Sequence, residues 1–342
     1  MIIGNRKIGP YEPPLIIVEI GINHGGDINL AKKMVKLAFE SGAECIKHQT
    51  HFVEDEMTEE AKSIFPPNAD ISIWEVMESC ALSKVDEIKL KNYTESLGLI
   101  YISTPFSRKA ADFLSSIDVP AFKIGSGEAD NLPLIKHIAE LGKPIIMSTG
   151  MQSITSLKKS VEILNSSNVE FALLECTNLY PSPPETVSLG GILELQRAFP
   201  EVDVGFSDHS VGPDMALASV ALGACIIERH FTDSRYRVGP DISCSMDPAE
   251  LRKLVCRSKE IHTALHNIKE RSELEDSVYR FARGSVVADR DLISGEIIVP
   301  EDIWVRRPGT GEISPDMMEK LYGKTVKRNL KLNSQLKWKD FN

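Results

Sequence analysis

The chain has 342 residues, of which 42% are hydrophobic and 26% are charged, and its formal net charge at pH 7 is −10. This composition is typical of a globular protein with a large core. It lacks the basic surface that a general nucleic-acid binder needs, and no stretch reaches the ~20 apolar residues of a membrane span. The N-terminal segment has no apolar signal core, and the six cysteines show no CxxC or framework spacing. We therefore expect a cytoplasmic protein with reduced thiols.

Eight apolar segments of strand length occur along the chain, and segments with helical periodicity separate them. The strand-like segments are residues 15–21, 45–51, 99–106, 121–128, 144–150, 171–178, 202–209 and 225–231. The helical pattern after the first of them has Asn29 as a candidate cap and Gly42 at its end. Eight alternations of strand and helix predict an α/β fold of the (β/α)8 TIM-barrel class.

The composition changes after the last helical segment. Residues 266–281 are polar and show no strand pattern, whereas residues 282–342 contain short strand-like runs separated by Gly and Pro turns. We predict a catalytic TIM-barrel domain over 1–265, a linker over 266–281 and a small C-terminal domain over 282–342.

Polar side chains end every predicted strand, which is where the active site of such a barrel lies. These residues are Glu19, Lys47, Gln49, Ser103, Thr104, Lys123, Ser126, Glu128, Ser148, Thr149, Thr177, Asn178, Ser207, Asp208, His209, Glu228, Arg229 and His230. Side chains two residues apart share one face of a strand, so Lys47 and Gln49 project together. The same holds for the pairs that end in His209 and His230. We expect these pairs to converge at the mouth of the barrel.

Lysines occur inside two of the predicted strands, where branched apolar residues are usual. Lys47 lies in CIKHQ and Lys123 in AFKIG, and a buried ammonium group needs a partner. One interpretation is an internal ion pair with Glu19 or Glu228. Two lysines beside strand-end hydroxyls favour the other interpretation, a bound phosphate or carboxylate.

Two histidines end neighbouring strands. His209 follows the seventh predicted strand and His230 ends the eighth, so both imidazoles can reach one metal ion. Two protein ligands leave an open site that suits Mn²⁺, Mg²⁺ or Co²⁺ acting as a Lewis acid, with water and substrate oxygens completing the shell. The alternative is that one histidine is a hydrogen-bonded core residue.

Nine motifs occur in order along the chain: EIGINHGGD (19–27), IKHQTHFVEDEM (46–57), ISTPFSRKAA (102–111), FKIGSGE (122–128), STGM (148–151), CTNLYPSP (176–183), GFSDHS (205–210), ERHFTD (228–233) and GPDISCSM (239–246). Together they resemble the sialic acid synthase (N-acetylneuraminate synthase) family, and the tail resembles that family's antifreeze-like (SAF) domain. One departure precedes the tail, where FARGS replaces a segment like FAFAS, so that Phe281 is kept and Arg283 is new. It falls where the resemblance places the N-acyl side of the sugar.

The resemblance implies a metal-dependent condensation of phosphoenolpyruvate with open-chain N-acetylmannosamine, which gives N-acetylneuraminate and phosphate. His209 and His230 would hold the metal, usually Mn²⁺. Glu128 would serve the water that adds to C2, and Glu19 would also be catalytic. The residues implied for phosphoenolpyruvate are Lys47, Thr104, Lys123, Ser126, Ser148, Asn178 and Ser207. Those implied for the sugar are Glu19, Gln49, Asn68, Tyr180, Asp241, Phe281 and Arg307.

Two alternatives stay open at this point. A synthase of the legionaminic or pseudaminic type would differ only in the N-acylated hexose it accepts. A non-catalytic sugar-binding protein would not need both histidines, both lysines and Glu128. The resemblance also implies a domain-swapped homodimer in which each small domain presents Arg307 to the other subunit's barrel. A solvated surface charge is the simpler interpretation of Arg307.

Overall fold

Contacts within the chain define two units. The computed structural model describes residues 1–66 and 69–342, and these divide into Met1–Asn267 and Ile268–Asn342. Each unit has a hydrophobic core of its own, and each is described here by itself.

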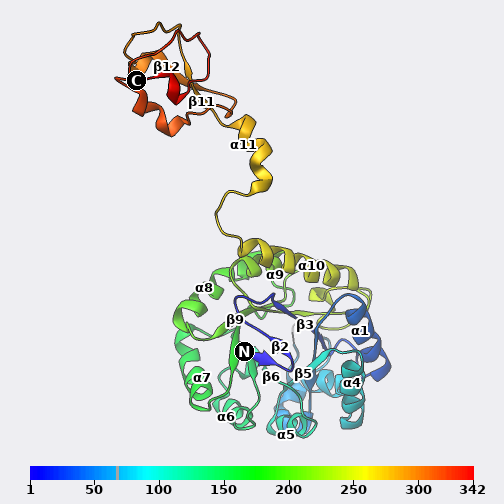
Figure 1. The fold of residues 1–342 in the computed structure, drawn as a ribbon. Helices are drawn as coiled ribbons and strands as arrows, with labels where there is room; N and C mark the ends of the chain where they lie inside the picture. The colour runs from blue at the N-terminus through cyan, green and yellow to red at the C-terminus, as the bar shows by residue number, and fades with distance from the viewer. Residues whose placement is uncertain (67–68) are drawn as a thin grey trace. The chain divides into compact units, whose positions relative to one another are not determined.

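The larger unit contains the predicted barrel, with eight parallel strands inside a ring of helices (Figure 1). The strands are β3 (Leu15–Gly21), β4 (Cys45–Thr50), β5 (Ile100–Pro105), β6 (Phe122–Ile124), β7 (Ile145–Ser148), β8 (Phe171–Cys176), β9 (Asp203–Asp208) and β10 (Ile226–His230). They pair in chain order, and β10 closes the barrel against β3. Each strand falls inside one of the segments predicted from the sequence, so the predicted fold class is confirmed.

Helices follow the strands and pack their apolar faces against them. They are α1 (Ile28–Glu40), α4 (Lys84–Ser96), α5 (Arg108–Ser116), α6 (Leu132–Glu140), α7 (Ile154–Ser166), α8 (Leu189–Ala198), α9 (Asp214–Ala221) and α10 (Pro248–Leu265). The N-cap predicted at Asn29 is wrong. Asp27 caps α1 instead, because its carboxylate accepts hydrogen bonds from the backbone N–H groups of Asn29 and Leu30.

The interior of the barrel is apolar at the N-terminal ends of the strands and polar at their C-terminal ends. The apolar layer consists of Leu15, Ile17, Cys45, Ile102, Ala121, Ile146, Ala172, Leu174, Cys225 and Ile226. A hairpin of β1 (Ile2–Ile3) and β2 (Arg6–Lys7) adds Ile3 and Ile8 to this layer and closes the floor of the barrel. Any site in the lumen therefore opens only at the C-terminal ends of the strands.

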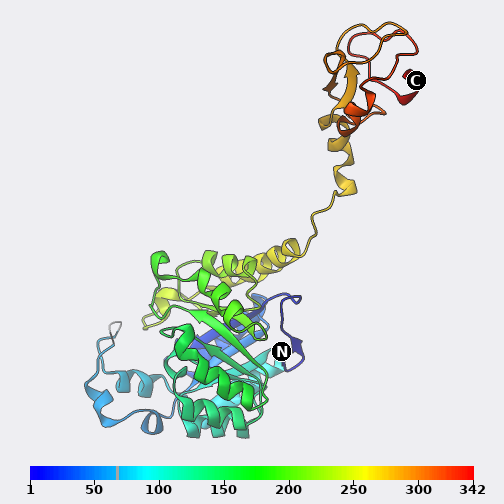
Figure 2. The same cartoon turned by 90° about the vertical axis from the view of Figure 1, so that its left-hand side faces the viewer.

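The segment between β4 and α4 lies at the end of the barrel opposite the N-terminus, coloured light blue in Figure 2. It contains α2 (Val53–Glu56) and α3 (Ile73–Cys80). Ser72 and Glu75 form a capping box that fixes the start of α3. A Cβ atom on Gly26 would lie 2.7 Å from the Ser79 carbonyl oxygen, so a glycine is needed where α3 packs on the loop after β3.

The smaller unit is built from short pieces around a core of its own. The pieces are α11 (Asp276–Ala282), β11 (Ser285–Ala288) and β12 (Ile303–Arg306), with 3₁₀ turns at Glu273–Glu275, Pro300–Asp302, Pro315–Leu321 and Trp338–Asp340. Strands β11 and β12 pair antiparallel. Part of the segment predicted as a linker is thus helical, since it contains most of α11.

Two absences concern the whole described chain. All six cysteines are free thiols, four of them buried. Among residues 1–66 and 69–342, no helix combines the length and the apolar character needed to cross a membrane.

Candidate active site

The polar residues at the C-terminal ends of the strands surround a cavity of about 140 Å³ in the lumen. Its lining consists of Lys47, Gln49, Thr104, Phe106, Lys123, Gly125, Ser126, Gly127, Ser148, Cys176, Asn178, Tyr180, Ser207, His209, Glu228 and His230. Every residue predicted to bind phosphoenolpyruvate is in this set, and so are both predicted metal ligands. The three pairs predicted to share a strand face also reach this one cavity.

Lys47 is held between two carboxylates. Its Nζ lies 2.8 Å from Glu19 Oε2 and 3.5 Å from Glu228 Oε1, and it donates to Thr104 Oγ1 at 3.3 Å. Burial alone would lower the pKa of Lys47, but the two carboxylates raise it above its usual value. The ammonium group therefore stays charged inside the barrel, and the internal ion pair considered from the sequence is present.

The positive charge of Lys123 is less well balanced by nearby carboxylates. Its Nζ donates to Ser148 Oγ at 2.7 Å and to the Ile124 carbonyl at 3.0 Å, and the closest Glu228 oxygen is 3.8 Å away. Burial lowers the pKa of Lys123, and Glu228 opposes this only in part. An anion bound beside Lys123 would supply the charge partner that the protein provides only at a distance.

Close packing of a glycine brings Ser126 and Asn178 together on the wall of the cavity. The Gly150 N–H donates to Ser126 Oγ at 3.1 Å. A Cβ atom at Gly150 would lie 1.9 Å from Asn178 Oδ1 and 2.8 Å from Ser126 Oγ. Any side chain at this position would therefore displace two predicted phosphoenolpyruvate ligands at once.

The two histidines face each other across the mouth of the cavity. Strands β9 and β10 are hydrogen-bonded neighbours, and the ring centroids of His209 and His230 are 5.3 Å apart. His209 Nδ1 lies 2.8 Å from the Thr177 carbonyl, so this nitrogen carries the hydrogen and Nε2 has a free lone pair. His230 Nδ1 is buried without a hydrogen-bond partner among the described residues. Burial lowers the pKa of both imidazoles, which keeps them neutral.

Two buried carboxylates flank the lysines. Glu228 lines the cavity, and its Oε2 has no hydrogen-bond partner in the part of the chain that the structure describes. Burial alone would raise the pKa of Glu228, but Lys123 and Lys47 lower it. Glu19 lies behind Lys47 and accepts a hydrogen bond from Gln49 Nε2 at 2.8 Å. Burial raises the pKa of Glu19.

Glu128 lies elsewhere than the other predicted catalytic residues. Its carboxylate accepts a 2.5 Å hydrogen bond from Asn131 Nδ2, and it lines a surface cavity beside α6 rather than the lumen. Phe106 lines both cavities. Glu128 itself does not line the lumen cavity, although the preceding residues Ser126 and Gly127 do.

The remaining predicted sugar residues divide among three places. Asp241 lines a second cavity of about 280 Å³ that also touches Gln49, Tyr180 and His230. Asn68 lies outside the described residues. Phe281 and Arg307 are exposed residues of the smaller unit. Near Phe281, the Arg283 guanidinium lies 4.7 Å from the centre of the Tyr279 ring and 3.9 Å from Asp316 Oδ1, so contacts within its own unit hold it.

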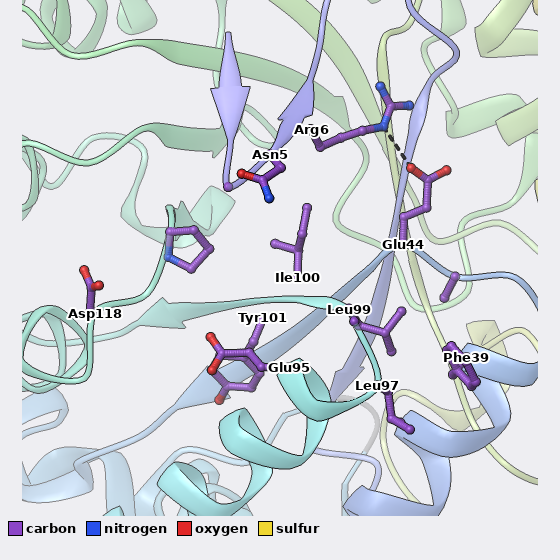
Figure 3. Close-up of a pocket in the computed structure, with 14 residues that line it drawn as sticks. Asn5, Arg6, Phe39, Glu44, Glu95, Leu97, Leu99, Ile100, Tyr101 and Asp118 are labelled. Atoms are coloured by element: carbon purple, nitrogen blue, oxygen red, sulfur yellow. Dashed lines mark hydrogen bonds and ion pairs between the residues drawn. The ribbon is translucent and has the colours of Figure 1, made fainter.

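A larger cavity, of about 620 Å³, opens at the opposite end of the barrel (Figure 3). The β1–β2 hairpin and the ends of α1 and α4 line it, and Arg6 Nε pairs with Glu44 Oε2 there at 2.8 Å. Its acidic side chains Glu95 and Asp118 pair with surface lysines. The described residues that line it include no histidine and no lysine, so the smaller lumen cavity is the better candidate for chemistry.

Four lining residues were not singled out from the sequence: Phe106, Gly125, Gly127 and Cys176. Strand parity placed Glu228 at the mouth together with His230, although the sequence assigned it no role beyond a possible ion pair with a lysine. The same alternation along the strand predicts that Cys176 points into the lumen, because it lies two residues after Leu174 of the apolar layer. Phe106 follows the end of β5, and its ring stacks on His51 at 4.5 Å. Only the tertiary structure reveals that contact.

Comparison with known proteins agrees with this geometry. Residues 34–270 match the NeuB family, and residues 283–342 match the SAF domain. The N,N'-diacetyllegionaminic acid synthase of Campylobacter jejuni is 36% identical over 325 residues, covering 93% of this chain and 97% of that protein. Human N-acetylneuraminate-9-phosphate synthase is 33% identical, covering 94% and 90%. The crystal structure of a sialic acid synthetase from Leptospira borgpetersenii, in complex with citrate, superposes with a TM-score of 0.75 at 32% identity, covering 81% of this chain and 94% of that one. The chain therefore belongs to the NeuB family of sialic acid synthases and carries a SAF domain at its C-terminal end.

Proposed function

We propose that the protein condenses phosphoenolpyruvate with the open-chain aldehyde of an N-acylated hexose such as N-acetylmannosamine. The C3 carbon of phosphoenolpyruvate attacks the aldehyde carbon, water adds to C2, and the C2–O bond to phosphate breaks. The products are inorganic phosphate and a nine-carbon 2-keto acid, N-acetylneuraminate for that acceptor. The observation that carries the proposal is the convergence of two buried lysines with two neutral imidazoles in one closed lumen.

The lysines and hydroxyls suit phosphoenolpyruvate. Lys47 and Lys123 supply two positive charges at the base of the polar layer, and Ser148 already accepts a hydrogen bond from Lys123. Donors preorganised in a site that excludes water stabilise a phosphate better than solvent does, because they do not reorient as charge moves. The carboxylates of Glu19 and Glu228 balance much of the positive charge of the two lysines.

The two histidines suit a divalent metal ion. We propose Mn²⁺, with Mg²⁺ and Co²⁺ as alternatives. Both rings are neutral, which is the form that binds metals. His230 Nδ1 accepts and donates no hydrogen bond among the described residues and lies 3.6 Å from Asp241 Oδ2. No group of three or more His, Cys, Asp or Glu side chains within residues 1–66 and 69–342 could hold a metal, so water and substrate oxygens would complete the shell. When bound, the cation would polarise the acceptor carbonyl as a Lewis acid.

Carboxylates in the lumen suit the second half of the reaction, because C2 becomes cationic once the new carbon–carbon bond forms. Glu228 lines the cavity, and its Oε2 accepts no hydrogen bond from a described residue and lies 3.8 Å from Lys123 Nζ. This carboxylate can stabilise the charge at C2 or accept a proton from the attacking water. Glu128 stays a second candidate. Separate Glu228→Gln and Glu128→Gln variants distinguish them, because the catalytic carboxylate should lower kcat strongly while the KM for phosphoenolpyruvate changes little.

A different acceptor within the same reaction class has specific support. Two relatives named N,N'-diacetyllegionaminic acid synthase, from Campylobacter jejuni and Legionella pneumophila, are 36% and 35% identical to this chain. A pseudaminic acid synthase of Campylobacter jejuni is 32% identical. We therefore include a bacterial-type diacylated hexose among the candidate acceptors. A sugar-binding protein without catalysis is not favoured, because binding alone does not need two buried lysines and two neutral imidazoles.

Metal removal tests the proposal directly. Phosphate release from phosphoenolpyruvate should stop after exhaustive treatment with EDTA and return with Mn²⁺, because two protein ligands hold a cation loosely. His209→Ala and His230→Ala should fold normally but lose at least about 100-fold in kcat. His137→Ala is the matched control, since this partly exposed histidine lies outside the lumen and pairs with Asp112. Full turnover in metal-free protein would refute the metal requirement.

A further inference from the structure

A chain of hydrogen bonds leads from the wall of the lumen to a buried imidazole. Gln49 lines both the lumen cavity and the second cavity of about 280 Å³. Its Nε2 donates to Glu19 Oε1 at 2.8 Å, and its Oε1 lies 3.1 Å from His51 Nε2. On the other side of the ring, His51 Nδ1 lies 2.9 Å from Glu56 Oε2. The side chains of His51 and Glu56 are 1% and 9% exposed, so water competes little for these contacts.

The orientation of the Gln49 amide follows from its partners. Although burial raises the pKa of Glu19, the Lys47 ammonium group lies 2.8 Å from Glu19 Oε2 and favours the carboxylate form. A carboxylate only accepts hydrogen bonds, so the amide must face it with its NH2 group. Gly21 leaves room for this arrangement, because a Cβ atom there would lie 3.1 Å from Gln49 Nε2. The carbonyl oxygen of Gln49 therefore faces His51.

The ring hydrogens of His51 follow from these contacts. Nε2 faces the carbonyl oxygen of Gln49, so it must carry a hydrogen. Nδ1 faces the Glu56 carboxylate, which also accepts, so a second hydrogen lies between these two atoms. The Glu56–His51 pair is thus neutral as a whole. A hydrogen bond to a charged partner is stronger than one between neutral groups, and it keeps the ring from turning over.

Packing also holds the pair in place. The Phe106 ring stacks on His51, with the ring centroids 4.5 Å apart and 14° between the planes. Glu56 is the last residue of α2, and the preceding residue Asp55 pairs with Lys109 Nζ at 2.9 Å. This ion pair ties the short turn of α2 to the start of α5. The imidazole therefore has little freedom to move.

We propose that His51, held by Glu56, is a positioning residue that makes Gln49 a hydrogen-bond donor to the acceptor sugar, an inference that rests on the proposed condensation. The oxygen of the Gln49 amide is occupied by His51, and one of its hydrogens by Glu19. The other hydrogen has no partner among the described residues. It is available to a hydroxyl or carbonyl oxygen of a sugar that extends from the lumen into the second cavity. Without His51 the amide could rotate and present its oxygen instead.

Phosphate release from phosphoenolpyruvate, with Mn²⁺ and varied N-acetylmannosamine, tests this role. His51→Phe keeps an aromatic ring against Phe106 but removes the donor. It should lower kcat/KM for the sugar by about tenfold, while the KM for phosphoenolpyruvate stays within about twofold. His51→Gln keeps an N–H donor close to the position of Nε2 and should recover most of the loss. Unchanged kcat/KM in His51→Phe, or a His51→Gln variant no better than His51→Phe, would overturn the inference.

A double-mutant cycle shows whether His51 acts through Gln49. In a Gln49→Leu background, His51→Phe should cause no further loss of kcat/KM beyond about twofold. A further loss of about tenfold would mean that His51 acts by another route, which contradicts the inference. Glu56→Gln should reproduce part of the His51→Phe effect. Glu59→Gln is its matched control, because Glu59 is exposed and pairs only with Lys62 among the described residues.

NMR of protein with isotope-labelled histidine nitrogens tests the hydrogen positions without turnover. The His51 signals are those that disappear in His51→Gln, and we expect them to show a hydrogen on Nε2 at pH 7. A ring with hydrogen on Nδ1 alone overturns the inference, because Gln49 would then have to face it with its NH2 group. The expected spectrum together with no phosphate release from any acceptor would refute the proposed function and leave the orientation of Gln49 intact.

Discussion

Lys47 and Lys123 occupy positions where a parallel barrel strand normally carries a branched apolar side chain. The sequence predicts that they need partners and lie among strand-end hydroxyls, and the structure has both features. The sequence could not predict which lysine lies closer to the carboxylates of Glu19 and Glu228. Lys47 forms close ion pairs with Glu19 and Glu228, whereas Lys123 has only a Glu228 oxygen at a longer distance. These distances depend on how each strand is rotated in the closed barrel.

At Gly150, the close approach of Asn178 leads to a specific prediction. Gly150→Ala should raise the KM for phosphoenolpyruvate by at least about tenfold, because a displacement of 1 Å in a binding group can cost that much or more. Steady-state kinetics with varied phosphoenolpyruvate measures the effect. Gly190→Ala is the control, since a Cβ atom there meets nothing within 4 Å. An unchanged KM would show that Asn178 and Ser126 do not contact this substrate.

Glu175 gives a prediction about pH and stability. Burial between β8 and α8 raises the pKa of Glu175 to about 7, and a Cβ atom on Gly191 would touch its carboxylate. Because this pKa exceeds the unfolded value of about 4.3, the folded state binds more protons between these two pH values, and its stability falls as pH rises through this window. Partial solvent exposure limits the loss to the order of 1 kcal/mol.

Glu175→Gln should therefore flatten the pH dependence of unfolding free energy between pH 4.5 and pH 7.5. Urea denaturation at several pH values measures it. Glu185→Gln, at an exposed position, serves as the control. Parallel curves for Glu175→Gln and the wild-type protein would mean that the carboxyl titrates normally in the folded state.

Strand β4 presents different chemistry on its two faces. Lys47 and Gln49 point into the lumen, while His48 and Thr50 point outward toward α4. There Glu87 accepts from Thr50 Oγ1 at 2.5 Å and from the Tyr101 hydroxyl at 3.1 Å, and its Oε1 lies 3.4 Å from His48 Nδ1. Glu87 thus fixes the outer face of the strand that carries two site residues on its inner face.

The protons of this buried network can be assigned. The Gly26 N–H donates to His24 Nδ1 at 3.2 Å, so the hydrogen of His24 is on Nε2 and points to His48 Nε2 at 3.1 Å. His48 then carries its hydrogen on Nδ1, toward Glu87. Burial lowers the pKa of His24 to about 3, so it remains neutral. Glu87 therefore accepts hydrogen bonds from two hydroxyl groups and lies 3.4 Å from His48 Nδ1, which has no hydrogen-bond partner among the described residues.

In Glu87→Gln, an amide NH2 group replaces one carboxylate oxygen. This new donor lies against hydroxyl groups that now donate to the carboxylate. We expect Glu87→Gln to lower the unfolding free energy by about 1–3 kcal/mol. It should also raise the KM for phosphoenolpyruvate more than it lowers kcat, since Lys47 would be misplaced while the carboxylates remain. Denaturation and steady-state kinetics measure the two effects, with Glu95→Gln on the exposed face of α4 as control. Lost stability with unchanged KM would limit Glu87 to a structural role.

At the level of elements, the barrel strands were predictable because each is a short apolar run that ends in polar residues. The β4–α4 connection was not predicted, although its residues Ile73, Val76 and Met77 line the second cavity, of about 280 Å³, beside the lumen. Helix α3 is only eight residues long, and it is positioned by its cap and by the contact of Gly26 with Ser79. These tertiary contacts leave no periodic signal in the sequence.

At the scale of the whole molecule, we propose a symmetric homodimer in which each SAF domain presents Arg307, and with it Phe281, to the partner's barrel. A mixing experiment tests this. His209→Ala retains a working SAF domain, and Arg307→Ala retains a working barrel. Refolding the two at equal concentrations should give heterodimers with one intact site and about a quarter of wild-type activity. Arg306→Ala, which alters the neighbouring residue, replaces Arg307→Ala in the control mixture. Activity no higher than in either parent, despite proven heterodimers, would refute this arrangement.

The hairpin at the floor of the barrel turns the lumen into a blind tube with one opening. Two reactants in such a tube must enter and leave in sequence, and the first to enter is the last to leave. In the proposed reaction, phosphate forms next to Lys47 and Lys123, below the longer sugar acid, and it cannot escape until that product has departed. Free phosphate outside the protein would then compete with phosphoenolpyruvate for the bottom of the tube. The turnover rate would therefore fall as the phosphate concentration around the protein rises.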